Sequence, residues 1–126
     1  MPSTETLERF IARVEDNAHP EAIEEFYAPH ATMRENQSAP RVGRGTLVSN
    51  ERGVMARAQS VRSQCVRPVL ASGEHVAIRW IFDFHWRDGS HSHIEEVTWQ
   101  RWEGEQIAEE TFFYDPAQMR PVKRPA

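Results

Sequence analysis

Two long segments of alternating apolar and polar residues constrain the fold of this chain more than any other feature. They run from Val76 to Trp86 and from Ser92 to Trp102, and both are rich in Trp and Phe. Alternation with a period of two is typical of β-strands that bury one face. The turn residues Arg87-Asp88-Gly89 separate them, and a third segment, Ile107 to Tyr114, follows Glu103-Gly104. The sequence therefore predicts an antiparallel sheet in the C-terminal half.

The N-terminal half has the residue spacing of helices. Apolar residues recur every three or four positions across residues 4–17, and Ser3 offers an N-cap. A second helix is predicted to begin at Pro20, which suits a first helical turn, and to end by Pro29. A third is predicted from Thr46 to about Ala58. Because helices come first and strands follow, the sequence predicts an α+β fold.

The segments between these elements are shorter or less regular. Residues 31–35 are predicted to be extended, and residues 36–44 to form a loop. Residues 61–68 alternate with a period of two and end at Pro68, which predicts a strand that lies at an edge or carries a bulge near its end. Residues 116–126 contain three prolines and are predicted to fray.

Length and composition limit the classes of protein. One domain fits 126 residues, with a core at about 4–116 and a tail at 117–126. The net charge is −4 and basic residues are scattered among acidic ones, so no nucleic-acid footprint is present. No apolar run reaches membrane-spanning length and no signal peptide is recognisable, so we expect a cytoplasmic protein. The single cysteine, Cys65, excludes an internal disulfide and is expected to be a buried strand residue.

The turn at residues 87–89 decides which residues face the core. A two-residue turn would pair Arg87 with Ser90, whereas a three-residue loop with a left-handed Gly89 would pair Trp86 with Ser90. A shift of one residue would move every side chain to the other face. The three-residue loop is favoured because it separates apolar from charged residues. The inner face then holds Val76, Ile78, Trp80, Phe82 and Phe84 beside Ile94, Glu96, Thr98, Gln100 and Trp102.

The same loop type at residues 102–104 brings two acids together. It would pair Arg101 with Glu105 and set Glu96 opposite Glu110, with Ala108, Phe112 and Tyr114 on the same inner face. Two neighbouring carboxylates in an apolar setting cannot both ionise without a large energetic cost, so one should hold its proton near neutral pH while the other acts as a base. This division suits acid–base chemistry on a small carbonyl compound.

Each acid also has a purely structural interpretation. A strand Glu taken singly is more often solvated or paired with an arginine, and Arg34, Arg79 and Arg101 are candidate partners. The outer face of the same strands carries Ile81, Val97 and Trp99 within a ring of charge. Exposed apolar patches of this kind commonly mark interfaces, so we expect a homodimer through the outer sheet face.

The histidines raise the question of a metal. His91 and His93 share a strand face, with His85 across the turn and Asp83 behind it, and zinc needs three or four ligands. The cluster lies at a hairpin tip without an evident outer partner, so surface histidines are the favoured interpretation and no metal is predicted. The remaining histidines lie next to turns and indicate no site: His19, His30 and His75. No phosphate-binding loop, Ser nucleophile elbow or paired-Cys motif occurs.

Several stretches together resemble a known family. They are residues 25–31 (Glu-Phe-Tyr-Ala-Pro-His-Ala), residues 40–43 (Pro-Arg-Val-Gly), and above all residues 94–102 and 107–116, which end in Phe-Tyr-Asp-Pro. Over about residues 5–118 the chain resembles the SnoaL-like branch of the nuclear transport factor 2-like superfamily. The resemblance implies an α+β cone, in which three N-terminal helices pack in the concave face of a strongly curved antiparallel or mixed sheet with a pocket at its wide mouth.

The resemblance also implies functions. Members include polyketide cyclases, ketosteroid isomerase-like enzymes, epoxide hydrolases and dehydratases, whose basic chemistry needs no cofactor, and such domains are usually dimers through the outer sheet face. The isomerases and cyclases use a pocket carboxylate, usually Asp, to move a proton beside a carbonyl. Glu96 or Glu110 is the counterpart offered by this chain, although neither matches the Asp positions of those enzymes. Fold alone does not decide between these activities.

Three functions remain open from the sequence. In a cofactor-free enzyme, Glu96 would abstract a proton from a small hydrophobic carbonyl compound. A protonated Glu110 would donate to the oxyanion or ease the charge near Glu96, while Gln100 and a tyrosine would orient the substrate. In a binding module, the same aromatic pocket would hold a small ligand or the sheet face a protein partner. In the third reading both acids sit in a filled core. The predicted site residues are Glu96 and Glu110 for catalysis, and Tyr27, Trp80, Phe82, Gln100, Phe112 and Tyr114 for ligand contact.

Overall fold

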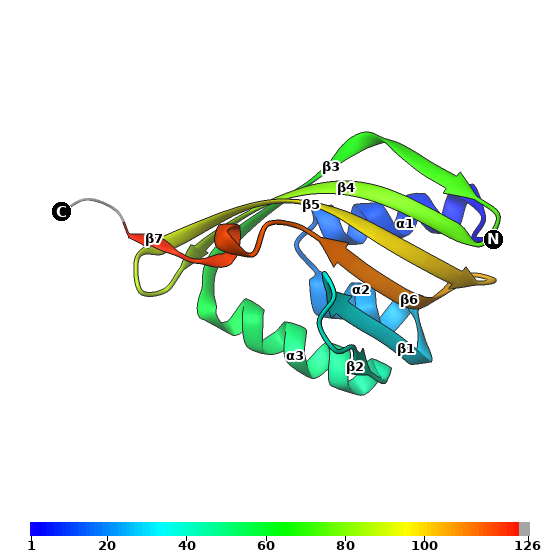
Figure 1. Cartoon of the computed structure of the whole chain (residues 1–126), viewed down its shortest axis with the longest axis horizontal. Helices are drawn as coiled ribbons and strands as arrows, with labels where there is room; N and C mark the ends of the chain where they lie inside the picture. Colours follow the sequence, from blue (N-terminus) through cyan, green and yellow to red (C-terminus); the bar gives the residue numbers. More distant parts are fainter. Residues whose placement is uncertain (124–126) are drawn as a thin grey trace.

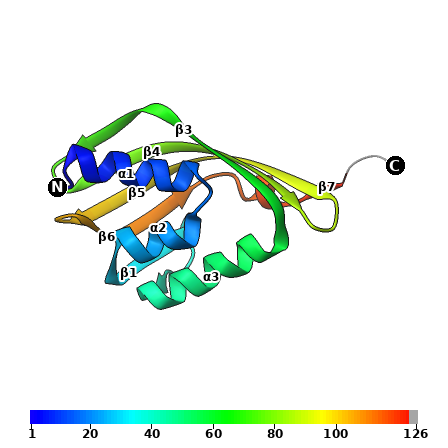
Figure 2. The same ribbon diagram turned by 180° about the vertical axis from the view of Figure 1, so that it is seen from behind.

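A strongly curved mixed sheet wraps around three helices in the computed structural model, which describes residues 1–123 (Figures 1 and 2). The helices are α1 (Thr4–Glu15), α2 (His19–Phe26) and α3 (Arg44–Arg57). The strands are β1 (Tyr27–Glu35), β2 (Arg41–Val42), β3 (Ala58–Ser72), β4 (His75–Trp86), β5 (Ser90–Glu103), β6 (Gln106–Phe113) and β7 (Val122–Lys123), with a short 3₁₀ helix, η1, at Pro116–Met119. The fold is the expected α+β cone.

The sheet is antiparallel except at one junction. Its strand order is β2-β1-β6-β5-β4-β3, with β7 paired to β5, and β1 runs parallel to β6. β3 therefore lies at one edge, and its pairing with β4 shifts register between Val66 and Leu70, around Pro68. The predicted edge position and irregularity near Pro68 are confirmed, and the irregularity is expected because a proline cannot donate to a regular ladder. The predicted end at Pro68 is wrong, since β3 continues to Ser72. Cys65 in β3 is a buried free thiol, as expected.

The helices cover the concave face of the sheet (Figure 2). Ser3 caps α1 by accepting a hydrogen bond from the Thr6 amide at 3.1 Å. α2 ends at Phe26 and not at Pro29, because the backbone is already extended at Tyr27. Pro29 instead lies in the stretch of β1 where the pairing with β6 is irregular, between Tyr27 and Thr32. The largest fully buried side chains join these helices to the sheet: Trp80, Trp102, Ile11, Leu47, Ile78 and Ile107.

The first hairpin has the predicted register. Phe84 pairs with Ser92 and Trp80 with Glu96, which is the register of a three-residue loop, and Gly89 is left-handed at φ +88°. The even-numbered residues of β4 from Val76 to Phe84 consequently face inward. The predicted inner face of β4 and β5 is therefore confirmed.

The prediction of a frayed tail is wrong for the part of it that the structure describes. η1 packs beside β5, and β7 pairs with it at Ser90–Lys123 and His91–Val122. The Glu95 amide donates to Gln118 Oε1 at 3.0 Å. This segment supplies partners to the half of β5 that β6 does not reach. Residues 124–126 of the predicted tail lie outside the described residues.

Candidate functional site

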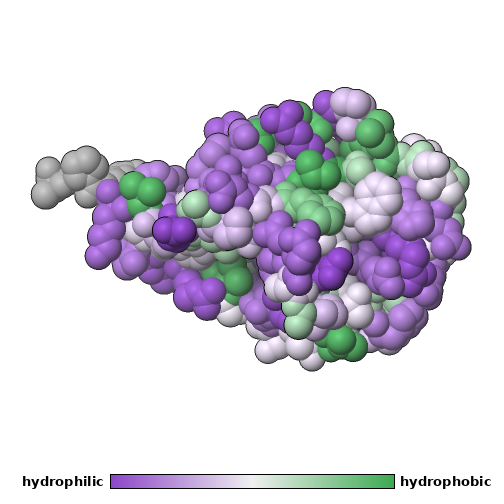
Figure 3. Space-filling view, viewed as in Figure 1, coloured by the Kyte–Doolittle hydropathy of each residue, from purple (hydrophilic) through white to green (hydrophobic). Residues whose placement is uncertain are grey.

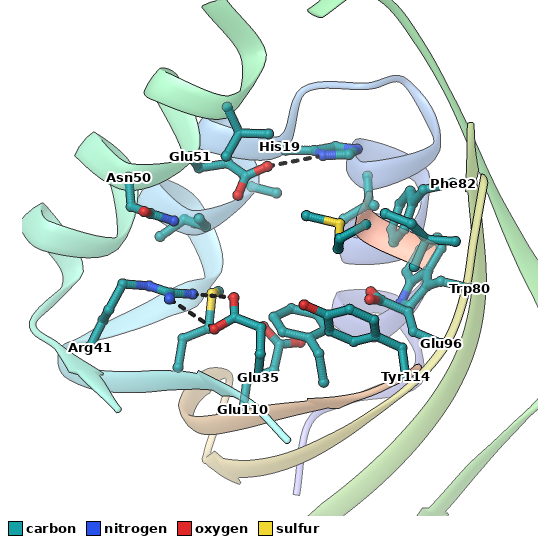
Figure 4. A pocket seen from close by; sticks show the side chains of 18 of the residues that line it. His19, Glu35, Arg41, Asn50, Glu51, Trp80, Phe82, Glu96, Glu110 and Tyr114 are labelled. Atoms are coloured by element: carbon teal, nitrogen blue, oxygen red, sulfur yellow. Dashed lines mark hydrogen bonds and ion pairs between the residues drawn. The ribbon is translucent and has the colours of Figure 1, made fainter. Parts of the chain in front are cut away.

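A cavity of about 140 Å³ opens between the concave face of the sheet and the helices (Figure 4). One wall is aromatic and comes from the sheet, with Trp80, Phe82 and Phe112 among its residues. The opposite wall comes from the helices and combines apolar residues, such as Ile23 and Val54, with Asn50 and Glu51 on α3. The space is on the scale of one six-membered ring. The cavity excludes the interpretation in which both acids sit in a filled core.

Two irregularities in the second hairpin decide where Glu110 points. The predicted three-residue loop is wrong: Glu103 pairs with Gln106 across a two-residue turn that begins at the left-handed Gly104 (φ +60°). That register alone would turn Glu110 to the outer face. A bulge between Arg101 and Trp102 restores the inward direction, because it places one extra residue in β6. Ile107 and Ala108 are consequently both buried, although they are consecutive.

Glu110 thus faces inward but not opposite Glu96 as predicted. Its cross-strand partner is Gln100, and continuing the same register would set Tyr114 opposite Glu96. Both acids nevertheless line the cavity, in agreement with the inference that they point into one hollow. They differ in what surrounds them.

Glu110 is held by three neutral donors and is only 3% exposed. Thr98 donates to its Oε2 at 2.8 Å and Gln100 Nε2 to the same oxygen at 2.6 Å, while the Tyr27 hydroxyl donates to Oε1. Burial raises the pKa of Glu110, and these three hydrogen bonds act in the opposite direction. Because three donors hold its two oxygens in place, Glu110 is called the anchored acid below.

Gln100 is a support for Glu110 and not a cavity residue. The indole nitrogen of Trp102 donates to Gln100 Oε1 at 2.9 Å, which fixes the amide so that its nitrogen faces Glu110. Gln100 is fully buried and does not line the cavity. The predicted ligand contact by Gln100 is corrected accordingly, because the bulged register makes Glu110 its cross-strand partner and its amide donates to that carboxyl.

Glu96 has a different environment. It lines the cavity next to its cross-strand neighbour Trp80, and among residues 1–123 its side chain takes part in no hydrogen bond or ion pair. Burial, followed by the charge of Glu110, raises its pKa to about 8. The arginines considered as partners lie elsewhere: Arg34 contacts Thr111, and Arg101 pairs with Glu103 and Glu109.

Each of the two predicted tyrosines lies near one of the two acids, Tyr27 at Glu110 and Tyr114 at Glu96. Tyr27 is buried against Glu110, and burial together with that charge raises its pKa well above the ordinary value, so it keeps its proton and donates it. Tyr114 is half-buried in the cavity wall near Glu96 (Figure 4). Burial also raises the pKa of Tyr114, which leaves a neutral hydroxyl facing the hollow.

Five polar residues of the cavity were not predicted from the sequence: His19, Glu35, Arg41, Asn50 and Glu51. Glu35 and Arg41 form a two-pronged ion pair, with the shorter contact at 2.6 Å. His19 lies against Glu51, their closest atoms 3.3 Å apart, although its place beside a turn indicated no site. None of these contacts joins sequence neighbours within one strand or helix turn, so periodicity gives no signal for them.

The hairpin histidines form surface contacts. His93 Nδ1 lies 2.5 Å from Asp83, and the His85 and His91 rings stack with centroids 6.1 Å apart. The Asp83 carboxylate is the main cause of the raised pKa of His93. Within residues 1–123 no group of three His, Cys, Asp or Glu side chains is arranged to hold a metal ion.

The outer face of the sheet exposes large apolar side chains. Val97, Trp99 and Phe113 are 42%, 49% and 42% exposed, and Val97 and Phe113 are direct cross-strand partners. Figure 3 shows apolar residues near the middle of this face with hydrophilic residues around them. No helix within the described part of the chain is long and apolar enough to cross a membrane.

Comparison with known families identifies the fold family. Residues 7–110 match the SnoaL-like domain. The chain belongs to the SnoaL-like family. That span runs from within α1 to Glu110, so it includes Glu96, Glu110 and most of the curved sheet. A comparison with curated proteins finds no match.

Solved structures share this SnoaL-like fold at low sequence identity. A Catenulispora acidiphila protein with a ketosteroid isomerase-like fold, crystallised with trimethylamine, is 19% identical (92% of this chain and 89% of that one; TM-score 0.76). A Burkholderia pseudomallei NTF2-like protein of unknown function is 14% identical (91% and 92%; TM-score 0.77). A Jannaschia protein proposed to be a SnoaL-like polyketide cyclase is 14% identical (98% and 94%; TM-score 0.77). At these identities the likeness establishes the fold.

Proposed function

We propose that this SnoaL-like protein is a cofactor-free enzyme of the isomerase or cyclase type, with Glu96 as general base on a small, largely apolar carbonyl compound. The observation that carries the proposal is the environment of Glu96. It is a carboxyl group without a partner, in a cavity, beside Trp80, with a pKa of about 8. A base of that strength is suited to removing a proton next to a carbonyl near neutral pH.

Each neighbour of Glu96 has a role in this proposal. The ionised Glu96 removes a proton from the carbon beside the carbonyl, and the electron pair of the broken C–H bond passes through the new C=C bond to the carbonyl oxygen. Tyr114 offers a neutral hydroxyl that orients the substrate. Glu110 acts on Glu96 through its charge, which contributes to the raised pKa of Glu96. The aromatic wall of Trp80, Phe82 and Phe112 holds the apolar part of the substrate.

The experiment measures exchange of the α-protons of a small ring ketone, cyclohexanone, for deuterium in D₂O by NMR. The wild-type protein accelerates this exchange, and Glu96→Gln lowers the catalysed rate by about 10²- to 10⁴-fold. Glu95→Gln is the matched control, since Glu95 is the adjacent residue on the exposed outer face. The proposal is wrong if Glu96→Gln keeps the wild-type rate. It is also wrong if the wild type exchanges cyclohexanone no faster than a variant in which both Glu95 and Glu96 are replaced by glutamine.

A second candidate is a binding module without a reaction, and one observation favours a particular ligand for it. A carboxyl without a partner beside Trp80 and Phe82 is suited to a small organic amine, which would gain both a charge partner and contact with aromatic faces. The related fold from Catenulispora acidiphila was crystallised with trimethylamine. Calorimetry with trimethylamine and with neutral tert-butanol tests this candidate. It predicts that only the amine binds, that Glu96→Gln abolishes binding, and that cyclohexanone is not exchanged.

We further propose that the protein forms a homodimer through the outer sheet face. The exposed apolar side chains of Val97, Trp99 and Phe113 lie together on neighbouring strands, with the Arg101–Glu109 ion pair beside them. Trp99→Arg should convert the dimer to a monomer in analytical ultracentrifugation. Leu70→Arg, at a more exposed site on the edge strand, should leave the dimer intact. A wild-type monomer at high concentration would contradict the proposal.

A further inference from the structure

We propose that His19 and Glu51 form a second proton-transfer site in the same cavity, which delivers a proton to the substrate oxygen while Glu96 removes one from carbon. This inference rests on the proposed function of Glu96. It concerns two residues from α2 and α3 that are 32 positions apart, and their closest atoms lie 3.3 Å from each other.

The tautomer that we assign to His19 follows from the hydrogen bonds of its neighbour Ser63. The Ser63 hydroxyl donates its single proton to Asn17 Oδ1 at 2.8 Å. Ser63 can therefore act only as an acceptor toward His19 Nε2, which lies 2.8 Å away, so Nε2 carries a proton. Histidine Nδ1 is then the nitrogen that faces Glu51 Oε1.

A proton between His19 and Glu51 is the consequence. If His19 were neutral with its proton on Nε2, Nδ1 would present a lone pair to a carboxylate oxygen, and two acceptors would face each other. One proton held between Nδ1 and Oε1 removes this repulsion and makes a charge-assisted hydrogen bond. The pair thus stores one transferable proton as long as Ser63 Oγ accepts the Nε2 proton of His19.

The pair is placed to act on a bound molecule. His19 is 8% exposed and the Phe82 ring packs against it with centroids 5.3 Å apart, which excludes bulk water from the imidazole. Both residues line the cavity, and Figure 4 shows them on the side away from Glu96 and Tyr114.

The proposed step balances protons and charge. Glu96 takes the proton from the α-carbon, the C–H electron pair forms the C=C bond, and the carbonyl π electrons move to oxygen. That oxygen receives, through the Glu51 carboxyl, the proton that the pair stored. Glu51 is left as a carboxylate, and His19 is left neutral with its remaining proton on Nε2, donated in a hydrogen bond to Ser63. The product is the enol, with Glu96 protonated and the pair deprotonated. Glu96 then returns a proton to a different carbon, which completes an isomerisation. The enol oxygen gives its proton back to the pair as the carbonyl re-forms.

The experiment compares Glu51→Gln with the wild type in the cyclohexanone exchange assay. A side-chain amide keeps the size of Glu51 and can still contact Nδ1, but it cannot supply a proton. We expect kcat to fall by about 10²- to 10⁴-fold while KM changes little. Glu103→Gln is the matched control, because Glu103 pairs with His30 at 3.1 Å on the exposed surface. The control should keep the wild-type kcat.

A second measurement reads the protons of His19 without any substrate. In ¹⁵N NMR, Nδ1 of His19 should carry a proton in the wild type and lose it in Glu51→Gln, while Nε2 keeps its proton in both proteins. A neutral His19 with a single proton in the wild type would overturn the inference. So would a wild-type kcat in Glu51→Gln when Glu96→Gln abolishes exchange, and that result would leave the proposed function of Glu96 standing. Absence of exchange in the wild type would instead remove the proposed function and this inference together.

Discussion

Glu110 and Glu96 lie on the same concave face of the sheet, yet they occupy opposite kinds of environment. Glu110 accepts hydrogen bonds from Tyr27, Thr98 and Gln100, whereas Glu96 accepts none from the described part of the chain and faces the cavity. Both have a raised pKa because removal from water penalises the charged form, and by exposed surface Glu110 is buried and Glu96 half-buried. The comparison shows that burial makes a carboxyl basic, and that the presence or absence of donors separates an anchored acid from one that is free to react.

The largest expected difference between the two acids concerns the pH dependence of stability. The folded pKa of Glu96, about 8, lies above its ordinary value of 4.5, so between these values the folded protein holds a proton that the unfolded chain releases. The free energy of unfolding should therefore fall as pH rises through this window. Glu96→Gln removes this loss, and at pH 9 the variant should be more stable than the wild type by up to about 5 kcal/mol.

Urea unfolding at pH 5 and pH 9 measures this difference. At pH 5 the wild type and Glu96→Gln should be close in stability. Glu96 is then protonated in the folded state, so an uncharged glutamine of similar size changes the free energy of unfolding little. Glu95→Gln on the outer face should show no such gain at pH 9. Parallel stability curves for wild type and Glu96→Gln would show that Glu96 is not buried as an unpaired acid.

The rate of ketone exchange should follow the ionisation of the same group. Only the carboxylate form of Glu96 can remove a proton, so the exchange rate should rise about tenfold per pH unit below pH 8 and level off above it. Between pH 6 and pH 9 the increase should be about 50- to 100-fold. A rate that is already constant above pH 6 would assign the base to a carboxyl with an ordinary pKa.

Replacing the anchored acid should affect folding at every pH. Glu110→Gln puts an amide nitrogen where one oxygen accepts from buried donors, so at least one of Tyr27, Thr98 and Gln100 loses its acceptor. An unsatisfied buried donor costs about 1–3 kcal/mol, and the free energy of unfolding should fall by that amount. Urea unfolding at pH 5, where Glu96→Gln has a small effect, separates the two acids. Equal stability of Glu110→Gln and wild type would contradict the anchoring role.

The smallest expected effect comes from removing one donor to Glu110. Tyr27→Phe keeps the ring in the core and deletes only the hydroxyl, which should cost about 1 kcal/mol. In a double-mutant cycle with Glu110→Gln, the two losses should be less than additive, because they break the same contact. Additive losses would indicate that Tyr27 and Glu110 contribute independently.

The sequence predicts the elements and the inner face of β4 and β5 because these depend on local patterns. The even-numbered apolar residues of β4 and the glycine at position 89 fix that register together. The same reasoning fails for the second hairpin, because a two-residue turn and a bulge each shift the pairing. The sequence of residues 103–108 gives no signal for the bulge. Glu110 still faces inward because the two shifts cancel in their effect on facing.

The rest of the site depends on contacts between distant segments. His19 meets Glu51 only because α2 and α3 pack side by side, and Ser63 reaches His19 from the edge strand. The ordered segment after Asp115 contacts β5 because β6 ends too early to pair with that part of it. Tertiary packing, which single-sequence patterns do not describe, places these residues.

Titration of the glutamate side-chain carboxyl carbons by ¹³C NMR tests the central claim most directly. The account predicts one resonance that titrates near pH 8 in the wild type and disappears in Glu96→Gln, while Glu95→Gln retains it. If Glu96 instead titrates near its ordinary value of 4.5, it is a solvated or paired acid, and the cavity does not contain the base on which the proposed function depends.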